Sequence, residues 1–411
     1  MTIEKLKTHK KILILGYGAE GKATHEFLKK HVPNSTVEIA DEEKDSNYLK
    51  KQHEYDLIIK TPGINKELVT KKYTTATNIF FANVKGTIIG VTGTKGKSTT
   101  ASLIYAILQN AGLKAHLVGN IGNSMLEELG KSNTIDDYFV CELSSYQLDD
   151  CRYSPHISVI TNVFPDHMNY HKTIDNYYEA KANIIRFATV NDFFVYNPKY
   201  AQLVALASHT KAKAIPYVEK SAIVSFDTFL IGEQNKDNIR AALTVARLLD
   251  ISQDVSKKTI STFKTLPHRL QNIGTFKGIT FYDDGSSVTP QSTIASLTSL
   301  AHVDTLLLGG QDRGYDFAEL VEAIISSSVN NIVLFPDSGN KIKKLLEEKK
   351  PHTYTYFETT SLHDAVLFAF SHTKQRKIVL LSNASPSYTL WKNFVEKGLE
   401  FQKFVIEAGT T

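Results

Sequence analysis

One stretch decides how we interpret the rest of the chain: Gly90-Val91-Thr92-Gly93-Thr94-Lys95-Gly96-Lys97-Ser98-Thr99-Thr100. A short apolar segment, residues 87–91, leads into the glycines, and residues 99–110 after them carry apolar side chains at helical spacing. The pattern predicts a strand, a glycine turn and a helix, in which backbone N–H groups surround an anion. The Lys97 amine can then reach a terminal phosphate, and the Ser98 hydroxyl can ligate Mg²⁺.

The spacing within this loop differs from that of the usual P-loop. The first glycine of that motif would lie five residues before Gly96, where this chain has Val91, and Gly93 supplies the turn instead. The alternative is a turn rich in glycine and threonine that binds nothing. The flanking strand and helix favour a phosphate-binding loop.

The bulk properties indicate an ordinary globular enzyme. A chain of 411 residues with 42% hydrophobic and 22% charged residues predicts two or three domains. A formal charge of +4 does not indicate a nucleic-acid partner, and the two cysteines provide neither a disulfide framework nor a CxxC site. The first eleven residues have no apolar core typical of a signal peptide, and no apolar run is long enough to span a membrane. We therefore expect a cytoplasmic enzyme without a membrane partner.

The first part of the chain predicts a small Rossmann-like domain. An apolar strand at 12–15 leads into Gly16-Tyr17-Gly18-Ala19-Glu20-Gly21, and a helix follows with Ala23, Phe27 and Leu28 on its inner face. A second strand at 36–40 ends at Asp41, and a third at 56–60 runs into Thr61-Pro62-Gly63-Ile64. The acidic residue about twenty positions after the glycines is typical of a dinucleotide-binding unit. The alternative is that the glycines only permit tight packing. NAD and a sugar nucleotide both remain open as ligands, and a mostly polar stretch at 65–83 leads to the next domain.

The central region places candidate catalytic residues after its strands. A strand at 138–141 ends in Glu142, where P-loop proteins have a carboxylate that binds Mg²⁺. The strand at 157–161 opens onto a loop with His167, which can point into the same cleft, and with His171, expected further out. In the helix at 177–187, Lys181 lies between alanines; the residues alone favour a surface lysine over a shielded, reactive one.

Later in this region we expect a strand at 222–230 and then a helix. Asn235 and Asn238 lie near the start of that helix, and their spacing favours capping over contact with a ligand.

The last part predicts a doubly wound α/β domain. The segment Leu266-Pro267-His268-Arg269-Leu270 marks its start, and strands are expected at 279–283, 304–308, 331–335 and 377–381. Helices are expected to begin near Pro290, Phe317, Gly339, Leu362 and Tyr388. Ligand residues in such sheets follow the carboxyl ends of the strands. The candidates there are Asp283, Asp284, residues 309–313 and residues 382–387.

Taken in order, these motifs resemble those of the Mur ligases, and the likeness covers nearly the whole chain. The motifs are Gly93-Thr94-Lys95-Gly96-Lys97-Ser98-Thr99, Glu142-Leu143-Ser144-Ser145-Tyr146-Gln147-Leu148, Asn162-Val163-Phe164-Pro165-Asp166-His167, Lys181, Gly232-Glu233-Gln234-Asn235-Lys236-Asp237-Asn238 and Leu266-Pro267-His268-Arg269. The segment 143–148 and the Rossmann-like start look like the branch that adds D-glutamate to UDP-N-acetylmuramoyl-L-alanine in peptidoglycan synthesis.

The resemblance implies an α/β fold of three domains. Residues 1–84 would bind the UDP substrate, residues 85–266 would form the P-loop-type domain that binds ATP, and residues 267–411 would form a doubly wound Rossmann-like domain for the amino acid. It further implies the two substrates UDP-N-acetylmuramoyl-L-alanine and D-glutamate, a monomer, and the absence of nucleic acid.

The resemblance also assigns roles to single residues. Residues Gly93, Thr94, Lys95, Gly96, Lys97, Ser98 and Thr99 would bind the triphosphate of ATP, and Asn235, Asn238, Arg269 and Asp284 would surround the nucleotide. Ser98 and Glu142 would hold one Mg²⁺ and His167 the second, with Lys181 carbamylated by CO₂ as a further ligand. This set makes Lys97, Glu142, His167 and Lys181 the catalytic residues. UDP would contact Gly16, Gly18, Gly21, Asp41, Thr61, Pro62, Gly63 and Asn120, and D-glutamate would contact Arg313, Ser387 and Phe394.

One motif departs from the family. Many of these ligases have Asp-Ser-Lys-Ala-Thr after the first strand of the third domain, where this chain has Asp284-Gly285-Ser286-Ser287-Val288-Thr289 without a lysine. A cationic contact near the amino-acid carboxylates is missing, although Arg313 could clamp a carboxylate with two hydrogen bonds. One alternative is a ligase that adds another amino acid such as L-glutamate, or that acts on a folate, although the Rossmann-like UDP domain argues against a folate. The other is an ATP-binding regulatory module without turnover, against which the intact Lys97, Glu142, His167 and Lys181 argue.

Overall fold

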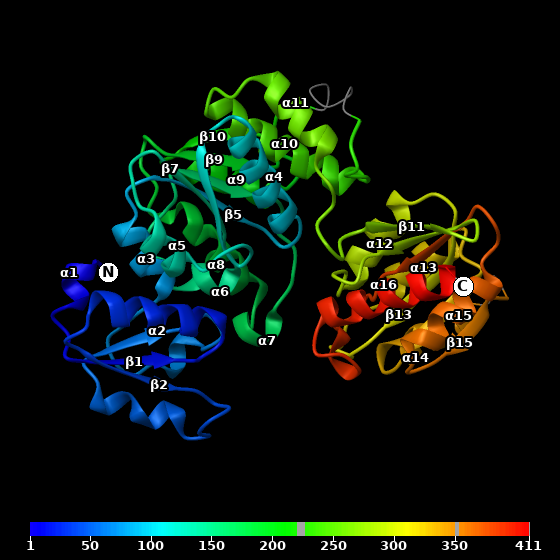
Figure 1. Cartoon of the computed structure of the whole chain (residues 1–411), viewed down its shortest axis with the longest axis horizontal. Coiled ribbons are helices and arrows are strands. Elements are labelled where there is room, and N and C mark those ends of the chain that lie inside the picture. Colours follow the sequence, from blue (N-terminus) through cyan, green and yellow to red (C-terminus); the bar gives the residue numbers. More distant parts are fainter. Residues whose placement is uncertain (220–226, 350–352, 411) are drawn as a thin grey trace. The chain divides into compact units, whose positions relative to one another are not determined.

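The computed structural model describes residues 1–219, 227–349 and 353–410 (Figure 1). The first sheet has the order β2-β1-β3-β4 and is parallel. Its strands are β1 Lys11–Leu15, β2 Thr36–Ala40, β3 Leu57–Lys60 and β4 Tyr73–Thr74. Its helices are α1 Ile3–Leu6, α2 Ala19–His31 and α3 Ala76–Asn83, with 3-10 turns η1 Tyr48–Glu54 and η2 Lys66–Leu68.

The predicted strands of this sheet are confirmed, but two details are wrong. The buried face of α2 carries Thr24 with Phe27 and Leu28, whereas Ala23 is only half-buried. The stretch at 65–83 is no polar connection, because it contains β4 and α3, and α3 buries Ile79 and Phe80 completely. The ring of Phe80 lies edge-on to that of Phe139 at 5.4 Å, so α3 packs into the core of the next sheet.

The second sheet has the order β10-β9-β8-β5-β7-β6 and is also parallel. Its strands are β5 Thr87–Thr92, β6 Lys114–Gly119, β7 Asp137–Glu142, β8 Ile157–Ile160, β9 Phe193–Tyr196 and β10 Lys213–Pro216. Because β5 pairs with both β7 and β8, the carboxyl ends of these three strands meet at one edge of the sheet. Of the predicted strand at 222–230, residues 222–226 lie outside the described residues, and residues 227–230 form no strand.

The helices of this region alternate with its strands. They are α4 Lys97–Asn110, α5 Met125–Lys131, α6 Ser145–Asp149, α7 Met168–His171, α8 Ile174–Arg186, α9 Ala201–His209, α10 Glu233–Leu248 and α11 Gln253–Thr262. The helix after the glycine loop is confirmed, with Leu103, Ile104, Ile107 and Leu108 buried.

The third sheet has the order β11-β12-β16-β13-β14-β15, with β11 antiparallel and the other strands parallel. Its strands are β11 Gln271–Phe276, β12 Ile279–Asp283, β13 Val303–Gly309, β14 Asn331–Phe335, β15 Thr355–Glu358 and β16 Ile378–Leu381. Its helices are α12 Pro290–Ser299, α13 Ala318–Ile325, α14 Ser338–Lys349, α15 Leu362–His372 and α16 Phe394–Thr410. The four predicted strands are confirmed. The last helix begins at Phe394 rather than near Tyr388, which lies in the 3-10 turn η4 Ser387–Thr389.

The chain forms two compact units, one of residues 1–228 and 235–263, the other of residues 229–234 and 264–411. The first unit contains two sheets, which a buried ion pair joins: Lys60 Nζ at the end of β3 lies 2.6 Å from Asp150 Oδ2 after α6. Gln147 of α6 also donates to Glu20 of α2 at 3.0 Å. The domain boundaries predicted at 84/85 and 266/267 remain predictions.

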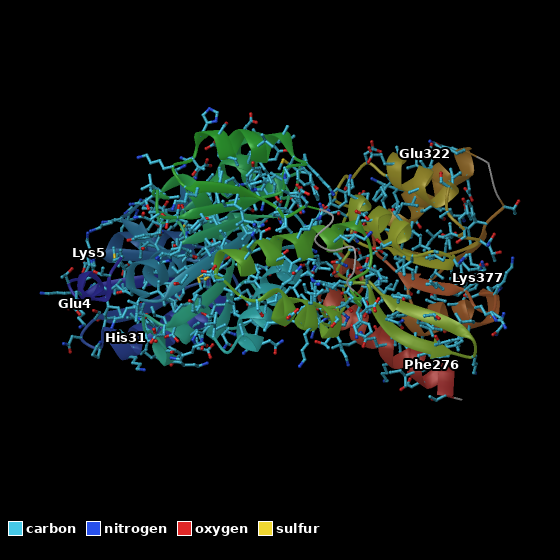
Figure 2. All side chains as sticks on the ribbon, turned by 90° about the horizontal axis from the view of Figure 1, so that it is seen from above. Glu4, Lys5, His31, Phe276, Glu322 and Lys377 are labelled. Atoms are coloured by element: carbon cyan, nitrogen blue, oxygen red, sulfur yellow. The ribbon has the colours of Figure 1, made fainter. Side chains whose placement is uncertain are left out.

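Charged side chains such as Glu4, Lys5 and Glu322 are exposed on these units (Figure 2). Within the part of the chain that the structure describes, no helix combines the length and the apolar character needed to cross a membrane.

Candidate functional site

The glycine loop between β5 and α4 can be built only with glycine at two positions. Gly93 and Gly96 have positive φ angles of 150° and 81°. A Cβ atom on Gly93 would lie 1.9 Å from Thr161 Oγ1, and one on Gly96 would lie 2.3 Å from Asn238 Oδ1. Both the backbone conformation and the close neighbours therefore exclude a side chain here.

Neighbouring residues hold the loop in this conformation. Thr94 N donates to the Asn162 carbonyl at 3.0 Å, and Lys95 N donates to Asn162 Oδ1 at 2.8 Å. The Lys97 amine donates to the carbonyls of Gly93 and Thr94, each at 3.0 Å. The cation thus lies directly over the loop, where it can meet the phosphates of a nucleotide.

Glu142 ends β7 beside this loop and offers a carboxylate oxygen to a cation. Its side chain is 1% exposed, and Oε1 accepts a hydrogen bond from Asn120 Nδ2 at 3.0 Å. Oε2 is buried and accepts no hydrogen bond from the described residues. A buried carboxylate oxygen without a donor fits a bound metal ion, and oxygen ligands suit Mg²⁺. Asn120, predicted to contact the UDP substrate, here holds the carboxylate of Glu142.

Lys181 is buried in α8 rather than lying on the surface, so the expectation drawn from its neighbours alone was wrong. It is 2% exposed, and its amine donates to the Gly93 carbonyl at 2.9 Å, the same oxygen that Lys97 contacts. Burial, and then the charge of Lys97, hold the pKa of the Lys181 amine well below its ordinary value. The face of the Tyr177 ring lies 4.7 Å from the amine. The environment therefore favours the neutral, nucleophilic form of this amine.

The two histidines after β8 occupy different surroundings. His167 has a left-handed backbone conformation with φ of 58°, and its ring lies 5.1 Å from that of Tyr146. Burial lowers the pKa of His167, although Asp166 opposes this, so the imidazole is available as a neutral ligand. His171 was expected further out, but it is buried among tyrosine rings, and its Nε2 lies 3.0 Å from Ser145 Oγ.

No group of three or more His, Cys, Asp and Glu side chains that could hold a metal ion occurs among the described residues. A metal at this edge would therefore need ligands of other kinds, such as the Ser98 hydroxyl or a modified lysine.

The spacing of the two asparagines near the start of α10 had favoured a capping role, but neither residue caps this helix. The helix begins at Glu233, so both residues lie within its first turns and are buried. Asn238 Oδ1 accepts from Thr100 Oγ1 at 3.2 Å, and its Nδ2 donates to Asn235 Oδ1 at 3.1 Å. Asn238 thus contacts the helix that follows the glycine loop and lies against Gly96 of that loop.

In the first sheet, packing already explains two of the glycines in the Gly16–Gly21 motif. A Cβ atom on Gly16 would lie 2.1 Å from Thr61 Oγ1, and one on Gly21 would lie 2.2 Å from the Gly16 carbonyl. No atom of the described residues lies within 4 Å of such a Cβ on Gly18, and the same is true of Gly63, which follows Pro62. Asp41 accepts a hydrogen bond from Tyr17 N at 2.5 Å. The open positions Gly18 and Gly63 are where a ligand could approach the backbone.

The second unit contains the remaining predicted residues. Asp284 is buried, and its oxygens accept from Leu270 N and Ser382 Oγ, each at 3.0 Å, and from Ser296 Oγ at 2.5 Å. Burial raises the pKa of Asp284 to about 6. Ser387 is buried with its Oγ 3.3 Å from Asn383 Nδ2. The remaining three are less buried: Arg313 is exposed, and Arg269 and Phe394 are half-buried.

Sequence reasoning missed Lys397 in α16. This lysine is 0% exposed, and its amine lies 4.1 Å from the ring of Phe335 and 4.5 Å from that of Trp391. The amine is also 3.5 Å from the Gly309 carbonyl, just before the segment with Arg313. Burial holds its pKa well below the ordinary value. The spacing was a usable signal, because Lys397 lies four residues before the buried Phe401 and eight before Val405.

Comparison with known proteins gives consistent results. A family model described as the Mur ligase middle domain matches residues 91–241. The UDP-N-acetylmuramoylalanine--D-glutamate ligase of Streptococcus agalactiae is 32% identical, with 96% of each chain covered. The enzyme of the same name from Caldanaerobacter subterraneus is 31% identical over 86% of this chain and 84% of that one.

Solved structures agree in fold. The MurF ligase of Thermotoga maritima in complex with ADP has a TM-score of 0.63 at 17% identity, covering 98% of this chain and 99% of that one. The UDP-N-acetylmuramate-alanine ligase MurC of the same organism has a TM-score of 0.64 at 16% identity, covering 97% and 100%. At these identities the likeness concerns the fold alone, and it confirms the predicted α/β class.

Proposed function

We propose that this chain, which belongs to the UDP-N-acetylmuramoylalanine--D-glutamate ligase family of Mur ligases, joins D-glutamate to UDP-N-acetylmuramoyl-L-alanine with cleavage of ATP to ADP and phosphate. The observation that carries the proposal is the meeting of Lys97 and Lys181 at the Gly93 carbonyl, at 3.0 and 2.9 Å, together with a buried Glu142 oxygen that accepts no hydrogen bond from the described residues. This combination suits phosphoryl transfer, and it supports the catalytic roles that the family resemblance implies for Lys97, Glu142 and Lys181.

The nucleotide would lie on the glycine loop. Residues 93–99 would surround the triphosphate, with Lys97 neutralising charge on the transferring phosphoryl oxygens. In the same unit Asn235 and Asn238 would contact the nucleotide. Arg269 and Asp284 are the nucleotide residues proposed for the second unit; the hydrogen bonds around Asp284 favour a supporting role there.

The metal ions would be Mg²⁺, one held by Ser98 and Glu142 and the other by His167 and a carbamylated Lys181. Bound Mg²⁺ would supply charge neutralisation at the phosphate oxygens. The carbamate forms when the Lys181 nitrogen bonds to the carbon of CO₂ and releases a proton. The side chain of Lys181 thereby changes from a neutral amine to an anion like a carboxylate, which the neighbouring Lys97 ammonium attracts. The burial of Lys181 and its contact with Gly93 support this modification.

The reaction proceeds in two steps. An oxygen of the substrate carboxylate attacks the γ-phosphorus of ATP, the bond to ADP breaks, and an acyl phosphate forms. The amine of glutamate then attacks the acyl carbon, loses a proton, and phosphate leaves from the tetrahedral intermediate. Lys97 stays beside the developing negative charge during the first step.

For the UDP moiety we propose Gly16, Gly18, Gly21, Asp41, Thr61, Pro62, Gly63 and Asn120. The open backbone at Gly18 and Gly63 supports this placement, while Gly16 and Gly21 shape the turn. For D-glutamate we propose Arg313, Ser387 and Phe394, with Arg313 as the carboxylate clamp. We further propose that the protein acts in the cytoplasm as a monomer. We also propose that it has three domains, formed by residues 1–84, 85–266 and 267–411.

Phosphate release with UDP-N-acetylmuramoyl-L-alanine, ATP and a panel of D- and L-amino acids tests this function. We expect release only when D-glutamate is present, and a loss of at least about a hundredfold in Lys97→Ala. Lys50→Gln, on the exposed surface, serves as the matched control. If none of the amino acids in the panel gave phosphate release, the ligase proposal would be refuted. Preference for L-glutamate would refute only the specificity for D-glutamate. This specificity is the part to test first, because the lysine after Asp284 is missing.

A further inference from the structure

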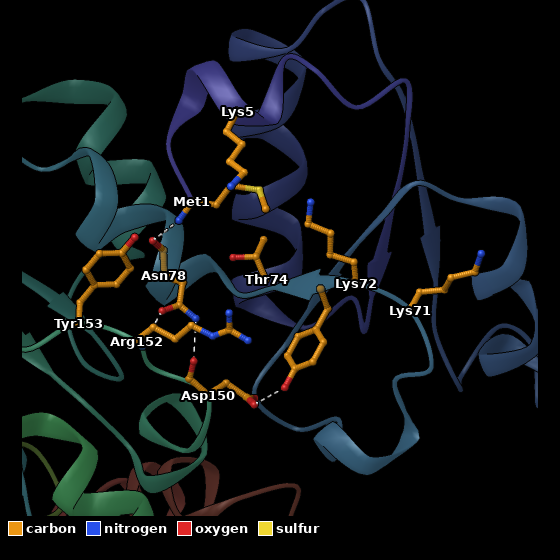
Figure 3. Close-up of a pocket in the computed structure, with 10 residues that line it drawn as sticks. Met1, Lys5, Lys71, Lys72, Thr74, Asn78, Asp150, Arg152 and Tyr153 are labelled. Atoms are coloured by element: carbon orange, nitrogen blue, oxygen red, sulfur yellow. Dashed lines mark hydrogen bonds between the residues drawn. The ribbon is translucent and has the colours of Figure 1, made fainter. Parts of the chain in front are cut away.

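A second polar pocket lies in the first unit, away from the glycine loop (Figure 3). It has a volume of about 400 Å³ and is formed where β4 and α3 meet residues 150–153. None of its lining residues belongs to the loop at 93–99, to the metal ligands proposed above, or to the proposed UDP-binding residues. Its size is at the small end of the range for ligand pockets.

Three cations converge on this pocket without compensation. In Figure 3 the amines of Lys5 and Lys72 and the guanidinium of Arg152 extend toward the space around Thr74. None of the three forms an ion pair with a carboxylate among the described residues. The carboxylate that lines the pocket, Asp150, is already engaged by Lys60 at 2.6 Å and by the Tyr73 hydroxyl at 2.8 Å. The pocket therefore has an excess of positive charge.

The scaffold of the pocket is fixed by buried hydrogen bonds. Arg152 N donates to Asn78 Oδ1 at 2.8 Å, and Asn78 Nδ2 donates to the Asp150 carbonyl at 2.7 Å. Asn78 and Thr74 are both buried. The backbone that carries Arg152 is thus tied to α3, so an anion would find this part of the site already formed.

A neighbouring histidine reports the same positive field. After burial, the charge of Lys72 is the largest influence that lowers the pKa of His9, and Lys5 acts in the same direction. Asp56 only partly opposes these two lysines.

We propose that this pocket binds a small anion with at least two negative charges, such as a diphosphate or a compact phosphorylated metabolite. Lys5, Lys72 and Arg152 would contact the phosphate oxygens, and the Thr74 hydroxyl would donate to one of them. Lys5 and Lys72 belong to the first sheet's segment and Arg152 to the second's. The bound anion would therefore link the two halves of this unit and stabilise their joint. The proposal does not rest on the ligase function.

Calorimetric titration with inorganic pyrophosphate tests the site, with inorganic phosphate as a second probe. The full chain carrying Lys97→Ala is used so that the glycine loop contributes little binding. We expect pyrophosphate to bind this protein more tightly than phosphate does, and Lys72→Gln with Arg152→Gln to weaken pyrophosphate binding by about tenfold or more, as for lost charge-assisted hydrogen bonds. Lys50→Gln removes one positive charge from an exposed site outside the pocket and should leave the affinity unchanged.

Arg152→Lys keeps the charge but loses the planar fork, and we expect an intermediate affinity. It also serves if the double variant does not fold. Equal affinities in the starting protein and in Arg152→Lys or the double variant would overturn the proposal, as would an equal loss in Lys50→Gln, which would indicate unspecific attraction. A rise in melting temperature with pyrophosphate that disappears in the pocket variants would support the linking role.

Discussion

Lys181 is the residue whose chemistry is most open to test. Replacing it with alanine removes the amine that would carry CO₂, and we expect phosphate release to fall by at least about a hundredfold, the scale for losing a charged group at a reacting phosphate. Short carboxylic acids such as acetate should restore part of this activity by occupying the space of the carbamate. The measurement is phosphate release with and without added acid.

Its control is Lys199→Ala, which removes an exposed lysine from the same unit. Full activity in Lys181→Ala would show that the carbamate is dispensable. Loss without rescue by any acid would leave the lysine essential but contradict its role as a carboxylate-like ligand.

Lys397 raises a different question. Burying its amine lowers the stability of the fold, and a role in function would explain why such a residue is present. In Lys397→Met the aromatic contacts with Phe335 and Trp391 can remain while the buried amine is lost. We expect the free energy of unfolding to change little or to rise by about 1–2 kcal/mol, because an apolar side chain avoids the cost of burying the polar amine. The KM for the amino acid should rise about tenfold, because the contact with the Gly309 carbonyl that steadies the segment with Arg313 is lost.

Denaturant unfolding and steady-state kinetics measure the two quantities separately. Lys392→Met, an exposed lysine just before α16, is the matched control and should change neither. An unchanged KM in Lys397→Met would mean that this lysine has no part in amino-acid binding.

At the scale of elements, the glycine loop makes a prediction that separates two physical effects. Gly96→Ala would place a Cβ atom at a φ of 81° and 2.3 Å from Asn238 Oδ1. Gly112, which follows helix α4, has a similar φ of 78°, but no atom of the described residues lies within 4 Å of such a Cβ. We expect Gly112→Ala to cost about 1–2 kcal/mol of stability from left-handed strain alone and to leave ATP affinity unchanged.

Gly96→Ala should cost about 1–3 kcal/mol more, because Asn238 must move, and it should weaken ATP binding. Thermal unfolding and ATP titration of both variants check this. Equal effects in the two variants would show that Asn238 does not press on the loop.

The same elements show how far the sequence alone reaches. The strand β5, the loop and α4 were predictable because their signals are local: a β-branched run, glycines and apolar spacing within 25 residues. Helix α3 was missed because Thr77 and Asn78 look polar, and the partner of Asn78 lies 72 residues away at Asp150. The burial of Lys181 was missed for a similar reason, since its partner Gly93 is 88 residues away. Buried polar side chains are satisfied by distant partners, which a local pattern cannot contain.

At the scale of the whole molecule, the two units carry buried ionisable groups with opposite pH responses. In the first unit burial lowers the pKa of His171 to about 4, from 6.5. The unfolded chain therefore binds a proton below pH 6.5 that the folded unit refuses until about pH 4, so this unit loses stability as the pH falls through that window. In the second unit burial raises the pKa of Asp284 from 3.8 to about 6. The folded unit keeps a proton there that the unfolded chain releases, so this unit gains stability as the pH falls from about 6 to 4.

We therefore expect calorimetry to show two unfolding transitions whose melting temperatures move in opposite directions between pH 6.5 and 4.5. Each kcal/mol of stability corresponds to about 2–4 °C for units of this size. His171→Gln, whose amide can still reach Ser145, should weaken the first response, to which His9, His25, His31 and His167 also contribute, and Asp284→Asn should flatten the second while keeping most hydrogen bonds. The variants also assign the transitions, because each should change the pH response of its own unit only. If both transitions fell together on acidification and neither variant altered that fall, the buried imidazole and carboxyl would not be the groups that set these stabilities.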